Sequence, residues 1–159
     1  MTNAQNPLLS DEFRIPFHEI RAEHVEPGIR QALEEAQAEI DAISDGTSPP
    51  TWANTIARMD AMSEVLGERF TPASHLVTVC ESPELREAFG VVLPEISAFW
   101  SALPLNAALW KRVKRYAETD EAAALTGLRR RHLDKTINEF KRAGADLNPD
   151  AKEELQALR

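Results

Sequence analysis

The sequence has little of what marks several classes of protein. It contains one cysteine, Cys80, so no disulfide can form within the chain, and a reducing compartment fits best. The first residues, MTNAQNPLLSDEF, lack the basic start and the apolar core of a secretory signal. No uninterrupted apolar run approaches the roughly 20 residues that span a bilayer. We therefore expect a soluble, cytoplasmic protein without a membrane partner.

Glycine is also scarce, with six in 159 residues, whereas Ala, Leu, Glu and Arg are abundant. This composition favours helices, and 43% hydrophobic residues are enough for one core. We expect an all-α fold, a single helical domain over residues 1–159 with about six or seven helices in an antiparallel array. Residues 1–21 are expected to form an irregular, extended strap that packs through apolar residues, because Pro16 argues against a central strand. The apolar residues are Leu8, Leu9, Phe13, Ile15 and Phe17.

Capping residues and prolines predict where the helices begin and end. Pro27 fits the first turn of a helix over about 27–44, and Thr51 caps the next. Gly67 and Pro72 are expected to break or kink that second helix, after which Val77 and Val79 could also be read as a strand. Further helices are expected from the Ser82 cap onward with a kink at Pro94, over about 106–117, over about 120–143, and from the Asn148 cap. The chain then stops without a helix terminator, which resembles a cut end.

Apolar spacing predicts the buried faces of the helices. In the helix that follows Ser82, we expect one broad apolar face. In the helix over 120–143, we expect a narrower stripe, and Thr126-Gly127 weakens its middle without necessarily ending it. The first face comprises Leu85, Phe89, Val92, Leu93, Ile96, Phe99 and Trp100, and the second comprises Leu125, Leu128, His132 or Leu133, Ile137 and Phe140.

Charge is unevenly distributed along the chain. Residues 1–110 carry 6 basic and 17 acidic side chains, whereas residues 111–159 carry 12 basic and 9 acidic ones. A nucleic-acid site needs a basic surface with stacking aromatics and little acid nearby. Trp110 and Tyr116 are present, but Glu118, Asp120 and Glu121 interrupt the basic region. Basic faces of solvated helices are far commoner, so we expect no nucleic-acid partner.

The stretch FHEIRAEH begins like the zinc-peptidase motif H-E-x-x-H. The fifth position of that motif must be His, and here it is Ala22. His24 lies six residues after His18, which would place the two rings on nearly opposite faces of a helix. A zinc site with two imidazoles at i and i+4 is therefore not predicted here.

Other catalytic arrangements are also missing from the sequence. Cys80 has only His75 within helical range as a base, and a small apolar role is its ordinary interpretation. The pairs Glu35/Glu39 and Glu64/Glu68 share helix faces but lack the histidines of a di-carboxylate metal site. There is no phosphate-binding loop, dinucleotide fingerprint or G-x-S-x-G. We predict no catalytic, cofactor-binding or metal-binding residue in this chain.

Several strings nevertheless resemble a known family. NPLL, EHVEPGI, TWANT, the SHL of Ser74–Leu76 and above all SPELREAF occur in order, followed by LDKTINEFKRAGADL. They are similar to the N-terminal region of the M3 family of zinc metallopeptidases, of the oligopeptidase A type, with thimet oligopeptidase and the peptidyl-dipeptidases as relatives. The resemblance runs along nearly the whole chain but covers only the N-terminal portion of the family.

The resemblance implies a helical domain that forms one wall of a deep channel for short, unfolded peptides. In the family, zinc and the general base are held by H-E-x-x-H and a later Glu in the C-terminal half, to which no position here corresponds. We therefore expect an inactive N-terminal fragment of a larger peptidase. Its partners would be the missing catalytic domain and, through the parent enzyme, oligopeptide substrates; zinc belongs to that parent. The alternative is a free-standing helical interaction module without enzymatic activity.

Overall fold

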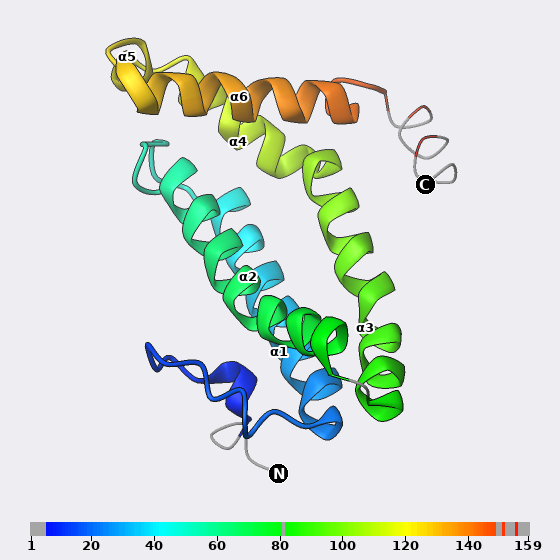
Figure 1. Ribbon diagram of the computed structural model, residues 1–159. Helices are drawn as coiled ribbons and strands as arrows, with labels where there is room; N and C mark the ends of the chain where they lie inside the picture. Colours follow the sequence, from blue (N-terminus) through cyan, green and yellow to red (C-terminus); the bar gives the residue numbers. More distant parts are fainter. Residues whose placement is uncertain (1–5, 81, 149–150, 152–154, 156–159) are drawn as a thin grey trace. The chain divides into compact units, whose positions relative to one another are not determined.

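The described part of the chain is mostly helical. The computed structural model describes residues 6–80, 82–148, 151 and 155, and these contain no β-strand, which confirms the all-α prediction (Figure 1). Two compact units are present: Met1–Gln37 with Met62–Ala98 (unit 1), and Ala38–Ala61 with Phe99–Arg159 (unit 2). A single domain over residues 1–159 stays a prediction. The elements are η2 (Pro7–Leu9), α1 (Ala22–Ser44), α2 (Ile56–Val79), α3 (Pro83–Ala102), η3 (Leu103–Leu105), α4 (Ala107–Ala117), α5 (Asp120–Ala123) and α6 (Gly127–Ala143).

Helix α1 begins five residues before the predicted start at Pro27. The backbone N–H of Arg21 donates to Nδ1 of His24 at 3.0 Å, a bond from the residue before the helix to a side chain in its first turn. This bond satisfies a backbone donor in the manner of a capping box, with His in place of Glu or Gln. The predicted start at Pro27 is wrong, because no common sequence pattern assigns a histidine that capping role.

Helix α2 is one uninterrupted element rather than the broken one predicted. It continues through Gly67 and Pro72 to Val79, so neither residue ends it, and the strand alternative for Val77 and Val79 is wrong. The pyrrolidine ring of Pro72 is buried, as are Ala73 and Leu76. Tertiary packing of this region therefore outweighs the cost of a missing backbone N–H at Pro72.

Helix α3 starts as the sequence predicts, but its buried face is narrower. The hydroxyl of Ser82 accepts a hydrogen bond from the N–H of Leu85 at 3.1 Å, which confirms the cap. Leu85, Phe89, Val92 and Ile96 are buried at spacings of three and four residues. Leu93 and Trp100 were also expected inside but are 43% and 38% exposed, and Phe99 is half-buried. Their positions lie off the central line of the stripe.

Glu84, in the first turn of α3, predicts an acid-sensitive contribution to stability. Backbone N–H groups and the Ser82 hydroxyl lower the pKa of Glu84 below its usual 4.5. Because the folded pKa is lowered, this contribution is complete above pH 4.5 and is lost as pH falls through the folded value. Glu84→Gln should flatten the loss of stability below pH 4.5, measured by urea denaturation at several pH values. Glu87→Gln, on the same helix, is the control; an identical pH profile for both variants would contradict the assignment.

The predicted helix over 120–143 is interrupted. α5 ends at Ala123, and α6 begins at Gly127, whose φ is 59°. Residues 124–126 between the two helices are not helical, and the left-handed Gly127 stands at the start of α6, so one continuous helix over 120–143 is wrong. Leu128 is consequently 84% exposed rather than buried, whereas Leu133 and Phe140 are buried as expected. Gly144, which follows the predicted last residue at 143, ends α6 with a φ of 99° as a left-handed cap.

Glycines in α3 and after α6 predict opposite effects of the same substitution. Gly90 lies within α3, and a Cβ added there would meet no heavy atom within 4 Å. Gly90→Ala should therefore stabilise the protein by about 0.5–1 kcal/mol through helix propensity. Gly144→Ala should destabilise it, because its φ is 99° and the new Cβ would meet Leu147 at 2.8 Å. Thermal denaturation measures both; equal shifts in melting temperature would contradict this assignment.

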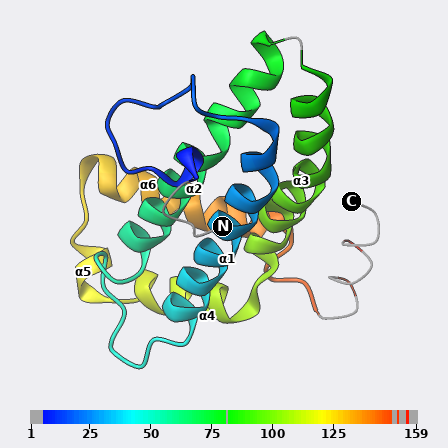
Figure 2. The same cartoon turned by 90° about the horizontal axis from the view of Figure 1, so that it is seen from below.

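The N-terminal segment is attached to unit 1 at two points. Asn6 caps η2 through Leu8 and donates to the carbonyl of His24 at 2.9 Å. Farther along, Arg69 of α2 donates to the carbonyl of Ser10 and pairs with Asp11. Figure 2 shows this segment running beside α2. Leu8 is buried, but Phe13 is fully exposed and Ile15 and Phe17 are also exposed, so the expected packing of these three residues is wrong.

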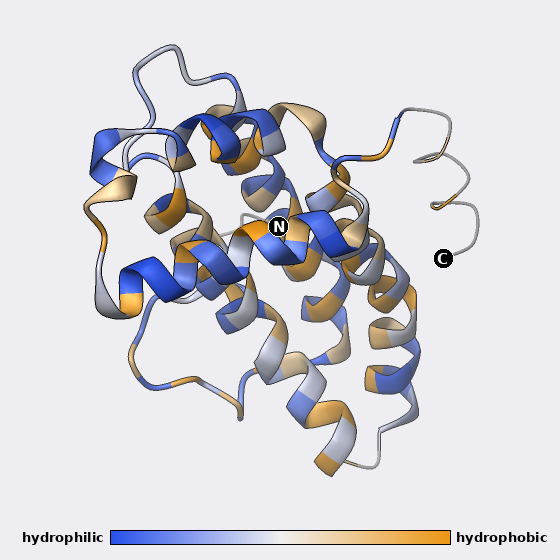
Figure 3. Cartoon of the chain, turned by 90° about the horizontal axis from the view of Figure 1, so that it is seen from above, coloured by the Kyte–Doolittle hydropathy of each residue, from blue (hydrophilic) through white to orange (hydrophobic). Residues whose placement is uncertain are grey.

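Unit 2 centres on α4, which the sequence places correctly at about 106–117. The side chain of Asn106 accepts from the N–H of Leu109 and begins the helix. The buried side of α4 packs against α6. There the rings of Trp110 and Phe140 stack with their centroids 5.4 Å apart. Figure 3 shows that most of α6 is hydrophilic. Asn148 accepts from the N–H of Ala151 as a cap would, and Ala151 and Leu155 are helical; the other residues of that predicted helix, including Leu158, lie outside the described residues.

One described segment, Pro83–Leu105, is long and apolar enough to cross a membrane by length and composition. The core helix of a soluble protein passes the same criteria. One such helix is weak evidence of a membrane span, and 22% of its apolar window is buried in the protein.

Candidate functional site

The four histidines are separated in the structure and take different roles. His24 bonds to the backbone before α1, and His18 is exposed beside Glu19. His75 is exposed and lies edge-on to Phe17 at 5.7 Å, whereas His132 pairs with Asp60 at 3.0 Å in unit 2. Among the described residues, no group of three or more His, Cys, Asp or Glu side chains could hold a metal ion.

Cys80 is exposed at the edge of an open pocket in unit 1. Phe17, Ile20, Leu76 and Leu85 supply the apolar part of its lining, and the volume is about 700 Å³. His75 does not line this pocket, so the base that a cysteine nucleophile would need is not supplied there. The expectation that Cys80 is a buried apolar residue is wrong, because it lies after the last residue of α2.

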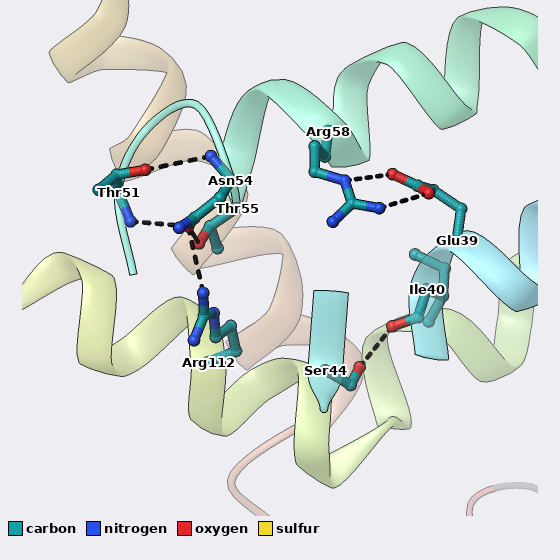
Figure 4. A network of polar contacts seen from close by, with 8 residues as sticks. All are labelled: Glu39, Ile40, Ser44, Thr51, Asn54, Thr55, Arg58 and Arg112. Carbon is teal, nitrogen blue, oxygen red and sulfur yellow. Dashed lines mark hydrogen bonds and ion pairs between the residues drawn. The ribbon is translucent and has the colours of Figure 1, made fainter. Parts of the chain in front are cut away.

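The TWANT string forms the most densely bonded polar region of unit 2. Thr51 and Asn54 exchange two hydrogen bonds: the N–H of Thr51 donates to Oδ1 of Asn54 at 2.8 Å, and the N–H of Asn54 donates to the Thr51 hydroxyl at 3.2 Å (Figure 4). The hydroxyl of Thr55 also donates to Oδ1 of Asn54 at 2.9 Å. Residues 52–55 form a turn, and α2 follows at Ile56. Thr51 thus caps a turn before the helix rather than the helix itself.

Arg112 of α4 lies against this turn and is 3% exposed. Its guanidinium donates to the carbonyls of Gly46 and Ser48 at 2.7 and 2.6 Å and to Oδ1 of Asn54 at 3.2 Å. Burial, followed by the charge of Arg115, lowers the pKa of Arg112. A buried cation held by neutral oxygens rather than by a carboxylate fixes the loop before α2 in one conformation. Arg112 was not predicted as a site residue, because spacing along the chain does not pair residue 112 with residues 46–54.

A second cluster surrounds Trp52 at the same end of α2. The N–H of Trp52 donates to both carboxylate oxygens of Glu121 at 3.2 Å, and the guanidinium of Arg129 lies 5.3 Å from its ring. His132 meets the ring edge-on at 5.9 Å. Glu39 of α1 and Arg58 of α2 form a further ion pair. The guanidinium Nε and Nη2 of Arg58 donate to the two carboxylate oxygens of Glu39 at 2.5 and 2.6 Å (Figure 4).

The two clusters hold helices and a turn together but offer little chemistry. Asn54, Thr55 and Arg112 bond to one another and to backbone carbonyls, and Nε of Arg112 is buried without a hydrogen-bond partner. The side chain of His132 is about 40% exposed and pairs with Asp60; the hydroxyl of Thr136 donates to the backbone carbonyl of His132, and no described hydrogen bond joins the imidazole itself to a serine, threonine or cysteine. Neither arrangement supplies a nucleophile with its base, and both are best interpreted as structural.

The family comparison assigns most of the chain. Residues 29–152, more than three quarters of the sequence, match the profile described as Neurolysin/Thimet oligopeptidase, N-terminal domain. The matching range begins within α1 and includes the TWANT turn and the SPELREAF cap, two of the strings that first indicated the resemblance.

Individual relatives agree with this result. Oligopeptidase A of Escherichia coli (strain K12) is 32% identical over 142 residues, which are 89% of this chain and 21% of the relative. The probable cytosolic oligopeptidase A of Arabidopsis thaliana is 29% identical over 157 residues, 99% of this chain and 22% of the relative. The dipeptidyl carboxypeptidase of Salmonella typhimurium is 28% identical over 162 residues, 96% of this chain and 23% of the relative.

The chain spans about a fifth of the length of these curated relatives. The aligned part, the helical fold and the order of the motifs agree with one another. The chain belongs to the M3 oligopeptidase family, as its neurolysin/thimet oligopeptidase N-terminal domain.

Proposed function

We propose that this chain forms one wall of a peptidase channel that admits short, unfolded peptides, and that it has no peptidase activity by itself. The observation that carries the proposal is the family match over residues 29–152 in a chain that aligns with about a fifth of each relative. The sequence contains no H-E-x-x-H, so zinc and the general base would come from a catalytic part of a parent protein. Oligopeptides would be the substrates of that parent.

The proposed role in mechanism is selection by access. A rigid helical wall narrows the channel, so that an extended peptide enters while a folded protein does not. The two clusters in unit 2 support this role, because buried bonds around Arg112 and Asn54 hold the loop before α2 in place. Preorganised walls of this kind position substrate without taking part in bond making.

A chimera tests the channel role. Replacing the 142 aligned residues of the E. coli oligopeptidase A with this chain should preserve cleavage of an unstructured decapeptide. The sequence of that decapeptide, inserted into a loop of a folded protein, should remain uncleaved by the chimera. Light scattering and circular dichroism would establish that the chimera is folded. A folded, monomeric chimera that cleaves the loop as fast as the free peptide would contradict the proposed role.

We also propose a cytoplasmic location for the parent protein. One relative is a probable cytosolic oligopeptidase A, although another is an organellar form from the same plant. Fractionation of the source cells with an antibody against this chain would test the location.

A free-standing interaction module is the second candidate function. It is favoured by large apolar side chains on the surface, among them Val79 at 59% and Leu147 at 43% exposure. Size-exclusion chromatography with light scattering distinguishes the two: a partner-dependent or dimeric species favours this candidate, and a monomer that binds little hydrophobic dye counts against it.

A further inference from the structure

An open groove lies in unit 1 between the N-terminal segment and α2. We call it the acidic groove. Asp11, Glu12 and Phe13 line it from the segment, and Glu64, Glu68 and Arg69 line it from α2. Its volume is about 810 Å³, within the size range of ligand sites. The groove lies within this chain and needs no catalytic half, so what it binds is independent of the function proposed above.

The charge of the groove is strongly one-sided. Four carboxylates line it, against one cation, Arg69. Arg69 is committed to the segment, because it pairs with Asp11 and donates to the carbonyl of Ser10. Glu64 and Glu68 are one helical turn apart, exposed, and have no described cation as partner. Like charges at i and i+4 destabilise a helix, so a cation bound beside them would relieve their repulsion.

An apolar anchor accompanies the carboxylates. Phe13 is fully exposed, and Ile15 is 43% exposed on the same side of the groove. The floor of the groove is open at Gly67, where an added Cβ would meet nothing within 4 Å. A phenylalanine left in water beside an open floor offers an apolar side chain of a ligand a surface to contact.

We propose that the acidic groove binds an extended peptide segment in which basic residues flank an apolar one. The carboxylates of Glu12, Glu64 and Glu68 would contact the ammonium or guanidinium groups. Phe13 and the space above Gly67 would take the apolar side chain. Charge complementarity selects this occupant over an acidic or purely apolar peptide.

The probe is a fluorescein-labelled peptide of sequence KLKFK, titrated with the full chain by fluorescence anisotropy. ELEFE tests the sign of the charge, and KGKGK tests the apolar contribution. We expect saturable one-to-one binding of KLKFK, about 10-fold tighter than either control, that weakens as salt shortens the screening length from about 8 Å at physiological ionic strength. Equal affinity for KLKFK and KGKGK would remove the apolar part of the proposal.

Matched variants locate the binding. Glu64→Gln with Glu68→Gln should weaken KLKFK about 5-fold to 10-fold, while Glu34→Gln with Glu87→Gln removes the same charge from exposed sites of unit 1 outside the groove and should change it less than 2-fold. Equal losses in the two pairs would mean general attraction to an acidic protein and would overturn the proposal.

A steric pair completes the test without changing any charge. Gly67→Leu fills the floor of the groove and should weaken binding at least 10-fold. Gly90→Leu is the control, because Gly90 is also helical with open space around it but lies on α3. Unchanged binding in Gly67→Leu would overturn the proposal. So would self-association of the chain through Glu64 and Glu68 without binding of KLKFK, since the groove would then be an interface between copies.

Discussion

Leu133→Ala should lower the free energy of unfolding by about 3 kcal/mol, among the largest effects of a single substitution in this chain. Leu133 belongs to α6, within unit 2, and its side chain is buried at 1% exposure. Removing three carbon atoms from a buried leucine loses their transfer free energy and leaves a cavity, which together cost about 2–5 kcal/mol. Urea denaturation followed by circular dichroism measures the change, provided the dependence on urea keeps its slope.

Leu128→Ala provides the control on the same helix. Leu128 is 84% exposed, five residues before Leu133, so the same substitution should change stability by less than about 0.5 kcal/mol. The comparison tests the register of α6 after the break at Gly127. If Leu128→Ala cost as much as Leu133→Ala, α6 would be rotated from the observed orientation, and the helix would more closely resemble the uninterrupted element predicted over 120–143.

Arg112→Met should destabilise the protein by about 2–3 kcal/mol. The substitution keeps much of the side-chain volume but removes three hydrogen bonds, to Gly46, Ser48 and Asn54. Hydrogen bonds from a charged donor contribute about 1.5–3 kcal/mol each, and buried carbonyls left unpaired add a cost. Part of this is offset, because the cation is no longer desolvated. Urea denaturation measures the loss, and hydrogen exchange over residues 46–55 should show that the loop opens more often.

Arg115→Met is the matched control on α4. Arg115 is exposed, and its positive charge repels that of Arg112. Removing the Arg115 side chain should therefore change stability by no more than about 0.5 kcal/mol. An equal effect of the two substitutions would show that helix propensity or net charge, rather than the buried bonds, determines the result.

Local signals in the sequence predict the ends of several helices. Ser82 caps its helix as expected, and the bounds expected near residues 106 and 143 coincide with a cap at Asn106 and a left-handed Gly144. Each of these residues decides the conformation of residues within one turn of itself. Start and end points fail where a distant group competes. Pro27 and Pro72 lie inside helices. Packing within unit 1 and the bond from Arg21 to His24 outweigh the local preference of proline for the first turn of a helix or a break. The break at Gly127 required its φ, which spacing does not reveal.

Burial was predicted for the centre of each apolar stripe and overestimated at its edges. Leu85, Val92 and Leu133 are inside, whereas Leu93, Trp100 and Leu128 are exposed. Periodicity assigns a side of a helix but not the width of the neighbour that covers it. Arg112 is the opposite case, because charged residues are seldom buried and only the fold brings it to the TWANT turn. Two of the strings that indicated the family, TWANT and SPELREAF, contain the turn before α2 and the cap of α3, which are local structures that short sequence signals can specify.

The most direct test of the account is the peptidase activity of the purified chain. The purified chain is dialysed against a buffer that contains zinc, and the zinc that it retains is measured by mass spectrometry. The same sample is then incubated with a quenched fluorescent oligopeptide to measure cleavage. The account predicts no cleavage above background and no zinc retained at a one-to-one ratio. Stoichiometric zinc together with cleavage that a chelator abolishes would contradict it, because this chain would then contain a complete catalytic site of its own.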